Sequence, residues 1–392
     1  MKILVLNSGS SSLKYQLFNV ENNNYDVIAK GLAERIGIKG SMVSIKYANG
    51  EKKSVAIDLP THNEALREVF NLLLNGAISS LEEISAVGHR AVHGGEKFKA
   101  SALVTEDVIN TIEELSQLAP LHNPAAVLGL RAVQKALPSV PQVVAFDTAF
   151  HQTMPKEAFL YGLPLEQYTK HQIRRYGMHG TSHQFVAEEC AKLIGKKGKI
   201  ITCHLGNGAS ISAVNNGECQ DTSMGFTPLA GVIMGTRCGD IDPYIPLHIM
   251  KYQDKTADEV NNLLNKQSGM LGLTGYSDMR DVEAKYLEGD KNAVDALQTY
   301  AYTIVKFIGS YIAALGGVDA IVFTAGIGEN SPIIRKMVLD RLSYLGLSVN
   351  EENNNKRGDA IEITNPGSKV KAFVIPTNEE LVIAQDTVRL AC

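Results

Sequence analysis

The chain has 392 residues, of which 44% are hydrophobic and 20% charged, and its formal net charge is −4. This length predicts two or three domains, because a chain this long exceeds the size at which a single hydrophobic core usually forms. The composition is typical of a soluble globular protein. Since no basic block is concentrated anywhere, we do not expect nucleic acid as a partner.

The five cysteines form no CxxC pair. Their odd number and wide spacing favour reduced thiols over a disulfide or zinc framework. The apolar run before Asn7 is too short for a signal peptide, and no stretch approaches the ~20 apolar residues of a membrane span. We therefore expect a cytoplasmic protein without a membrane partner.

Short β-branched runs alternate with longer helical patterns along the chain, which predicts an α/β fold. We expect strands at residues 2–6, 86–92, 143–146, 199–203, 320–323 and 370–375. We expect helices at residues 63–75, 124–136, 182–194, 295–315 and 379–390. The polar segment 350–358 is expected to be an exposed loop.

The sequence contains one internal similarity. Residues 2–9 (KILVLNSG) can be laid over residues 199–206 (KIITCHLG), about half the chain further on. In both, a strand pattern enters a small-residue loop that is followed by a second apolar run. This predicts two duplicated lobes that each present a loop to a shared cleft. Because the match is short, chance is the alternative.

Three loops rich in small residues could hold a phosphate. NSGSSSLK (7–14) is either a phosphate cradle with Lys14 as its charge or a hairpin turn, and it lacks the P-loop spacing. HLGNGAS (204–210) could equally be an Asn-Gly turn. FTAGIGENSP (323–332) lies between a strand and a helix capped by Ser331. Together they favour nucleotide binding.

Several charged residues lie near the ends of the expected strands. Arg90 lies in an apolar strand and requires a paired anion, which a structural salt bridge could also supply. Asp147 follows the strand at 143–146, a favoured functional position, although it could simply cap a turn. His122 precedes a helix and could be no more than a turn residue.

In HGTSH (179–183), Thr181 and Gln184 form a capping box, which places the helix start between the two histidines and disfavours zinc. His179, just ahead of that helix, is well placed to meet an anion.

Two further candidates follow. Arg237 lies in a glycine-rich loop, where pairing with Asp240 or Asp242 is the structural alternative. Thr377 and Glu380 form another capping box, so Glu379 falls in the first turn of a helix. It could complement the helix dipole or bind Mg²⁺.

Nine motifs, in order from residue 7 to residue 380, together resemble the acetate kinase family: NSGSSSLK, GHRAVHGG, APLHNP, AFDTAFH, YGMHGTSH, HLGNGAS, GTRCGDIDP, GIGEN and TNEE. The resemblance implies the sugar kinase/Hsc70/actin fold, an α/β fold of two duplicated ribonuclease-H-like lobes with a cleft between them. Residues 1–148 with 381–392 would form one lobe and residues 149–380 the other. It also implies a homodimer that phosphorylates acetate reversibly with ATP, giving acetyl phosphate and ADP.

The same resemblance implies a role for each matching position. Mg²⁺, or Mn²⁺ in its place, would be held by Asn7 and Glu379. ATP would contact Lys14, His204, Leu205, Gly206, Asn207, Gly208, Asp278, Met279, Arg280, Gly326, Ile327, Gly328, Glu329 and Asn330. The catalytic set would be Arg90, His122, Asp147, His179 and Arg237. The acetate pocket would consist of Arg90, Val92, Leu121, Met178 and Pro228.

The chemistry fits these residue types. An acetate carboxylate is already ionised at neutral pH, so catalysis requires positioning and charge stabilisation more than proton abstraction. Two arginines, a histidine and Mg²⁺ can neutralise the oxygens of the transferred group. We hypothesise that Asp147 orients an arginine or the metal shell and does not donate a proton.

One position departs from the family pattern, which usually reads YGFHGTSH. Met178 replaces the phenylalanine here, and its flexible side chain favours a slightly larger pocket. A propionate or short-chain acyl kinase is therefore the nearest alternative. A nucleotide switch of the actin or Hsp70 type is disfavoured, because no spare segment is long enough for a client-binding domain.

Overall fold

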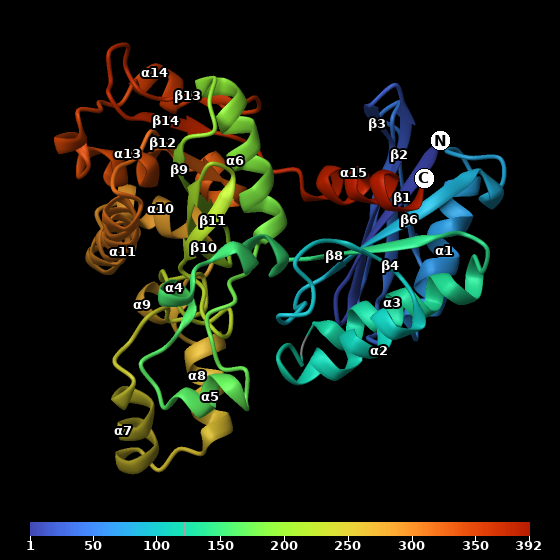
Figure 1. Ribbon diagram of the computed structural model, residues 1–392, viewed down its shortest axis with the longest axis horizontal. Coiled ribbons are helices and arrows are strands. Elements are labelled where there is room, and N and C mark those ends of the chain that lie inside the picture. The colour runs from blue at the N-terminus through green and yellow to red at the C-terminus, as the bar shows by residue number, and fades with distance from the viewer. Residues whose placement is uncertain (121) are drawn as a thin grey trace. The chain divides into compact units, whose positions relative to one another are not determined.

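The structure is a computed structural model that describes residues 1–120 and 122–392. The chain forms two compact units, each with its own β-sheet. The N-terminal unit comprises Met1–Phe150 with Asn378–Cys392, and the C-terminal unit comprises His151–Thr377. The C-terminal unit is thus a continuous segment inserted into the N-terminal one (Figure 1).

The N-terminal unit contains an eight-stranded sheet in the order β5-β4-β3-β2-β1-β6-β8-β7. Strands β1 to β5 form an antiparallel meander, and β6 and β8 continue the sheet parallel to β1. Its strands are β1 Lys2–Ser8, β2 Ser12–Glu21, β3 Asn24–Glu34, β4 Met42–Tyr47, β5 Lys52–Ala56, β6 Ile84–Ala91, β7 Ala102–Leu103 and β8 Gln142–Phe146.

Helices cover both faces of this sheet. Successive side chains of a strand point to opposite faces, and β1 is apolar throughout its centre, so both faces must be buried. Leu4 and Leu6 of β1 pack in one core with α1 (His62–Leu74) and α3 (Asn123–Ala136). Ile3 and Val5 pack on the opposite face with Ile383 of α15 (Glu379–Ala391). The last helix therefore completes the core of the first unit, as can be followed in Figure 1. A further helix, α2, spans Glu106–Glu114.

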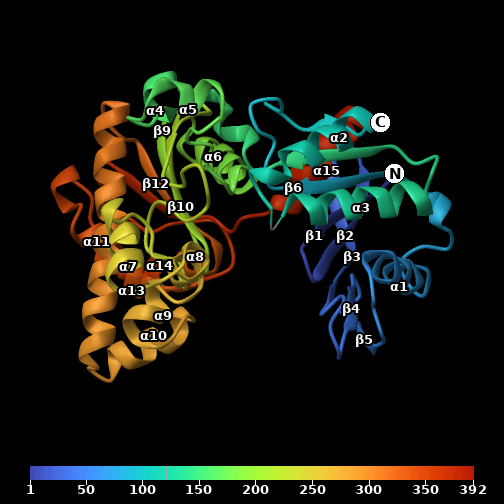
Figure 2. The ribbon, with the colours of Figure 1, turned by 90° about the horizontal axis from the view of Figure 1, so that it is seen from below.

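The C-terminal unit contains a six-stranded sheet in the order β11-β10-β9-β12-β14-β13. Helices α6 (Gly180–Ile194) and α11 (Lys291–Leu315) lie on its two sides (Figure 2). Its strands are β9 Lys199–Leu205, β10 Ala209–Asn215, β11 Glu218–Thr222, β12 Ala320–Thr324, β13 Ile361–Glu362 and β14 Lys371–Val374. Its other helices are α4 Lys156–Phe159, α5 Leu165–Thr169, α7 Tyr244–Tyr252, α8 Ala257–Lys266, α9 Gly269–Thr274, α10 Met279–Leu287, α12 Ala325–Asn330, α13 Pro332–Asp340 and α14 Glu351–Asn354. Short 3₁₀ turns occupy Leu81–Glu83, Leu115–Gln117, Ala149–Thr153 and Ser343–Leu345.

The two sheets repeat one topology. The run β3-β2-β1-β6-β8 has three antiparallel strands followed by two that are parallel to the first, and the run β11-β10-β9-β12-β14 has the same pattern. Strand β1 corresponds to β9, the pair that the sequence similarity at residues 2–9 and 199–206 had matched. The duplicated α/β lobe is therefore confirmed.

All the strands and helices expected from the sequence are present, with ends that differ by a few residues. The expected loop at 350–358 is wrong in part. It contains α14, and Asn354 is buried because its side chain accepts a hydrogen bond from Arg335 (Nε to Oδ1, 2.8 Å). Within residues 1–120 and 122–392, no helix is long and apolar enough to cross a membrane.

Candidate active site

The segment NSGSSSLK is the hairpin between β1 and β2, and it places Asn7 opposite Lys14. The turn closes through the Gly9 N–H, which donates to the Ser12 carbonyl at 2.8 Å. A Cβ on Gly9 would lie 2.8 Å from Ser12 Oγ, so the tight turn favours glycine there. The hairpin interpretation is correct, and the turn sets Asn7 and Lys14 side by side on neighbouring strands.

Arg90 and Asp147 form a bidentate ion pair at the carboxyl ends of β6 and β8. Arg90 Nε donates to Asp147 Oδ1 at 2.8 Å, and Nη2 donates to Oδ2 at 2.5 Å. Arg90 Nη1 also lies 3.4 Å from Asn7 Oδ1. Burial alone would lower the pKa of Arg90, but the charge and hydrogen bonds of Asp147 raise it. The guanidinium is therefore held ionised, with its plane fixed by Asp147.

Helix α15 brings two carboxylates to this corner of the N-terminal unit. Glu380 forms an ion pair with Lys14. Glu379 is the first residue of the helix, and burial raises the pKa of its carboxyl, with Arg90 opposing the rise and Asp147 adding to it. The predicted cap at Thr377 is wrong, because Asn378 caps the helix by accepting from the Leu381 N–H at 3.2 Å.

The oxygen donors of this corner suit a divalent metal ion. Asn7 Oδ1 lies 3.4 Å from Arg90 Nη1, and the charge of Arg90 acts on the Glu379 carboxylate. Mg²⁺ takes oxygen ligands, often one or two from the protein, with water and substrate phosphates supplying the rest. The described residues contain no cluster of three His, Cys, Asp or Glu side chains that could hold a metal ion by itself. The donor set therefore fits a metal that arrives with a phosphate ligand.

Two further candidates of the N-terminal unit, His122 and Val92, lie next to α3 and β6. His122 is the residue before α3 and accepts at its carbonyl from the Ala125 and Ala126 N–H groups. Val92 is half-buried immediately after β6. Leu121 lies outside the described residues.

In the C-terminal unit, His179 is the residue that precedes α6, and its backbone is left-handed (φ 58°, ψ 25°). The predicted cap at Thr181 is wrong, because the helix begins at Gly180 and the His183 N–H already donates to the His179 carbonyl. His179 Nδ1 lies 2.9 Å from Ser210 Oγ, and its ring stacks on His204 with centroids 4.1 Å apart. The imidazole of His179 is therefore held by a hydrogen bond at Nδ1 and by ring stacking on one face.

His179 and Arg237 converge on Gly208. A Cβ built on Gly208 would lie 3.5 Å from Arg237 Nη1 and 3.6 Å from His179 Nε2. Arg237 Nη1 also donates to the Pro228 carbonyl at 3.3 Å. Glycine thus leaves open the space into which an imidazole and a guanidinium both point, an arrangement suited to an anion.

Arg237 has no carboxylate partner in the described part of the chain. Asp240 accepts from the Gly231 N–H and Asp242 from the Tyr244 N–H, each at 2.8 Å, so the structural alternative for Arg237 is wrong. Burial lowers the pKa of Arg237. A half-buried guanidinium without a carboxylate gains from an anionic ligand.

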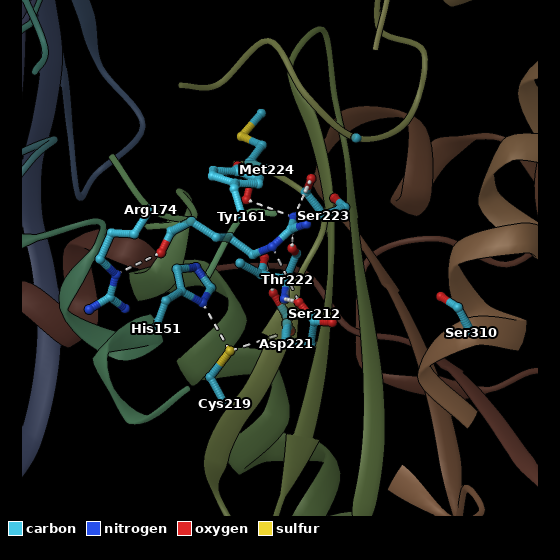
Figure 3. A network of polar contacts seen from close by, with 12 residues as sticks. His151, Tyr161, Arg174, Ser212, Cys219, Asp221, Thr222, Ser223, Met224 and Ser310 are labelled. Atoms are coloured by element: carbon cyan, nitrogen blue, oxygen red, sulfur yellow. Dashed lines mark hydrogen bonds and ion pairs between the residues drawn. The ribbon is translucent and has the colours of Figure 1, made fainter. Parts of the chain in front are cut away.

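A buried polar network includes His151 and Cys219 (Figure 3), and His151 also contacts the segment before His179. His151 Nε2 lies 2.9 Å from the Met178 carbonyl oxygen, and Nδ1 lies 3.1 Å from Cys219 Sγ. Gly177 has φ of +76°, and a Cβ there would lie 2.7 Å from the His151 ring. Met178 is buried, and its backbone carbonyl contacts His151.

A pocket of about 890 Å³ opens beside the loop between β9 and β10. This is large enough for a nucleoside. It is lined by eight of the residues expected to contact a nucleotide: Gly206, Asn207, Asp278, Met279, Arg280, Gly326, Ile327 and Asn330. The other six expected residues do not line it, namely Lys14, His204, Leu205, Gly208, Gly328 and Glu329.

The GIGEN segment, expected to be a loop, is the six-residue helix α12. Glu329 Oε1 accepts from the Ala325 N–H at 2.9 Å and from the Thr377 N–H at 3.2 Å, so this side chain braces the backbone. Arg335, fully buried in α13, donates through Nη1 to the Gly328 carbonyl at 2.8 Å. These contacts fix the wall of the pocket formed by Gly326 and Ile327.

Six pocket residues were not expected from the sequence: Ser277, Glu283, Ala284, Leu287, Ser331 and Arg357. Helical spacing could have found three of them. Glu283 and Leu287 follow Met279 at four and eight residues along α10, and Ala284 follows Arg280 at four, so they share a face. Arg357 could not have been found this way, because it comes from the segment after α14.

Comparison with known proteins gives one family over the whole chain. A model of the acetokinase family matches residues 2–385. The chain belongs to the acetokinase family. Relatives in the family include the acetate kinases of Halothermothrix orenii, 53% identical over 100% of this chain and 99% of that protein, and of Lachnoclostridium phytofermentans, 54% identical over 100% of both.

Solved structures within the family agree with the fold. The crystal structure of Porphyromonas gingivalis acetate kinase matches with a TM-score of 0.95 at 44% identity and covers 100% of both chains. A propionate kinase from Francisella tularensis matches with a TM-score of 0.93 at 42% identity and covers 99% of both. The ribonuclease-H-like duplication expected from the resemblance is thus the fold of solved members of the family.

Proposed function

We propose that the chain is an Mg²⁺-dependent kinase that transfers the γ-phosphoryl group of ATP to acetate, reversibly forming acetyl phosphate and ADP. The structural observation that carries the proposal is the convergence of His179 and Arg237 on the open space at Gly208. Membership of the acetokinase family, with relatives named acetate kinase along the full length, supports acetate as the acceptor.

Each unit supplies part of the chemistry. The pocket beside Asp278 and Ile327 suits the nucleoside, and the loop at 206–208 suits the phosphates. His179 and Arg237 donate N–H groups to the oxygens of the transferred phosphoryl group. From the N-terminal unit, Arg90 binds the acetate carboxylate with its plane set by Asp147.

The remaining residues assist these contacts. Lys14 adds positive charge for a phosphate, and Asn7 and Glu379 hold Mg²⁺ together with the nucleotide. When bound, Mg²⁺ neutralises phosphate charge and orients the oxygens. No general base is required, because the carboxylate that attacks is already ionised. The rate enhancement comes from alignment and from fixed donors around the developing charge.

The direct test is acyl hydroxamate formation from acetate, ATP, Mg²⁺ and hydroxylamine. We expect acetyl hydroxamate in proportion to ADP, with a loss of at least 100-fold in kcat for Arg237→Ala. Lys306→Ala, which changes an exposed residue of α11, is the control and should retain the parental rate. Slow ATP hydrolysis that is indifferent to acetate, without hydroxamate, would overturn the proposal and favour a nucleotide switch.

A propionate kinase is the second candidate, because one matching structure has that title and because Met178 stands where the family usually has phenylalanine. We expect kcat/KM for acetate to exceed that for propionate, and butyrate to be poor, since one methylene is worth ~1–3 kcal/mol in such a pocket. Met178→Phe should reduce propionate use more than acetate use. A parental preference for propionate would reverse the assignment.

We also propose a homodimer formed through α7. This helix has no buried residue, and it exposes Tyr244, Leu247 and Tyr252. An apolar face of this kind is a common mark of an interface. Leu247→Glu should yield a monomer in sedimentation, whereas Leu103→Glu, at another exposed leucine, should not. A parent that sediments as a monomer contradicts the proposal.

A cytoplasmic location is proposed with the same function. All five cysteines are free thiols, three of them buried, as is usual in a reducing compartment where ATP is abundant.

A further inference from the structure

One buried hydroxyl lies between two histidines of the C-terminal unit. Ser210 Oγ, on β10, is 2.9 Å from His179 Nδ1 and 2.7 Å from His183 Nε2, and Ser210 is completely buried. A hydroxyl has a single proton. It can therefore donate to only one of these nitrogens and must accept an N–H from the other.

Thr202 decides the direction. Its Oγ1, also fully buried, lies 2.7 Å from the other ring nitrogen of His183, Nδ1. If His183 donated from Nδ1, the proton of Thr202 would have no acceptor among the described residues. A buried hydroxyl without an acceptor costs about 1–3 kcal/mol. If Thr202 instead donates to His183 Nδ1, every hydroxyl proton has an acceptor. We therefore take Thr202 as the donor.

His183 is neutral and carries one proton. It lies on α6 in a buried position, with its ring centroid 5.7 Å from that of His151 and 6.1 Å from that of His204. Burial, and then these two histidines, lower the pKa of His183 well below its usual range. With Nδ1 accepting from Thr202, the single proton of His183 is on Nε2.

We infer that Thr202, His183 and Ser210 form a directed hydrogen-bond relay that fixes the tautomer of His179 with its proton on Nε2. Thr202 donates to His183, His183 Nε2–H donates to Ser210, and Ser210 donates to His179 Nδ1. These three are positioning residues that touch neither substrate nor nucleotide.

The relay gives His179 a defined task, and here the inference rests on the proposed function. His179 Nε2 faces the open space at Gly208 that Arg237 Nη1 also faces. The relay makes that nitrogen an N–H donor even in the neutral imidazole. Two donors are then aimed at the place proposed for the phosphoryl oxygens before any ligand binds.

The tautomer can be observed directly in the ligand-free protein. With ¹⁵N-labelled histidine, NMR couplings distinguish Nε2–H from Nδ1–H, and His179→Gln identifies the resonances among the ten histidines. We expect Nε2–H for His179 in the parent and a mixture in Ser210→Ala. The matched control is Ser212→Ala, which removes an equally buried hydroxyl two residues along β10, bonded to Thr222 at 2.8 Å. An Nδ1–H tautomer in the parent would overturn the relay.

Kinetics provide the second readout. Ser210→Ala should lower kcat on the order of tenfold and leave KM for ATP and acetate nearly unchanged, because binding does not require the tautomer. Thr202→Val, which removes the donor that sets the direction, should act the same way, and Thr202→Ser should restore kcat. Equal kcat for Ser210→Ala and Ser212→Ala would contradict the inference. A parent that forms no acetyl hydroxamate would overturn the proposed function, whereas the NMR measurement would still decide the relay.

Discussion

At the scale of single residues, Glu379 opposes stability at neutral pH. Burial raises the pKa of its carboxyl in the folded chain above the ordinary 4.5. Such a group contributes stability below the unfolded-state pKa, and that contribution is lost as the pH rises through the folded-state pKa. Binding of a metal ion and its phosphate ligands would then offset the penalty of the ionised form.

We therefore expect Glu379→Gln to be more stable than the parent at pH 7 and nearly equal to it at pH 4, below the ordinary pKa. Thermal unfolding between pH 4 and pH 8 measures this difference. Glu380→Gln is the neighbouring control, and because it removes the ion pair with Lys14 it should stabilise at neither pH. A gain for Glu379→Gln that is independent of pH would contradict the explanation.

Asp147 permits a second residue-scale prediction. Asp147→Asn removes the charge that fixes the plane of Arg90, so we expect kcat to fall on the order of 100-fold, as for other misplaced groups. Hydroxamate formation measures the loss. Asp386→Asn, which changes a carboxylate that pairs with Arg389 near the helix end, should retain kcat. Nearly full activity in Asp147→Asn would exclude both an orienting role and proton donation.

The sequence predicted these residue roles unevenly. The need of Arg90 for an anion followed from its apolar strand, and Asp147 supplies it. The cap at Thr377 failed because tertiary contacts engage that residue. Its hydroxyl lies 2.8 Å from Ser182 Oγ, and its N–H donates to Glu329. The relay could not be predicted, because its members come from β9, α6 and β10, and Thr202 and Ser210 are joined only by His183 of the helix.

At the scale of elements, the close approach of α15 to β6 depends on Gly88. A Cβ at this position would lie 2.4 Å from Thr387 Oγ1 and 2.7 Å from Ile383 Cγ2, both on α15. The glycine thus sets how closely the helix packs on the sheet, and with it the placement of Glu379 at the helix start.

We expect Gly88→Ala to lower the free energy of unfolding by roughly 2 kcal/mol, because overpacking displaces α15. Chemical denaturation measures the change, and activity should fall with it. Gly309→Ala is the control within α11, where nothing lies within 4 Å of the added Cβ. It should raise stability by roughly 0.5–1 kcal/mol through helix propensity. Parental stability in Gly88→Ala would show that the helix can shift freely.

Apolar periodicity predicted many of the helices and strands that carry the two cores, because burial of a regular face fixes them. It missed strands β3 and β4, which also belong to the N-terminal core, and the helices of nine or ten residues, namely α2, α7, α8, α10 and α13. It also missed α12 and α14, which are too short to show a period. In α12, the Glu329 side chain stabilises the start of the helix at Ala325, whose φ is +65°. A contact of this kind depends on the local backbone, and the glycines of GIGEN had suggested a loop.

At the scale of the whole molecule, the N-terminal unit is completed by a distant segment. Ile383 and Ala384 of α15 fill the core that contains Ile3, Val5 and Phe18. A chain that ends at Thr377 would leave this face of the sheet uncovered. The C-terminal unit would keep all of its residues, because it comprises His151–Thr377.

We therefore predict that residues 1–377 retain a protease-resistant C-terminal unit while the N-terminal unit is degraded. Addition of a peptide of residues 378–392 should restore protection, and the same peptide with Ile383→Asp should not. Limited proteolysis followed by mass spectrometry measures both. Protection of both units without the peptide would show that the sheet of the N-terminal unit is stable with one face bare.

The insertion of one unit into the other also sets an order of events during synthesis. Residues 151–377 leave the ribosome as an uninterrupted segment and can fold as soon as they emerge. The first 150 residues, although made earlier, must wait for α15. Throughout that interval an apolar sheet face remains exposed to chaperones and to neighbouring nascent chains, so the part of the protein made first is the part that matures last.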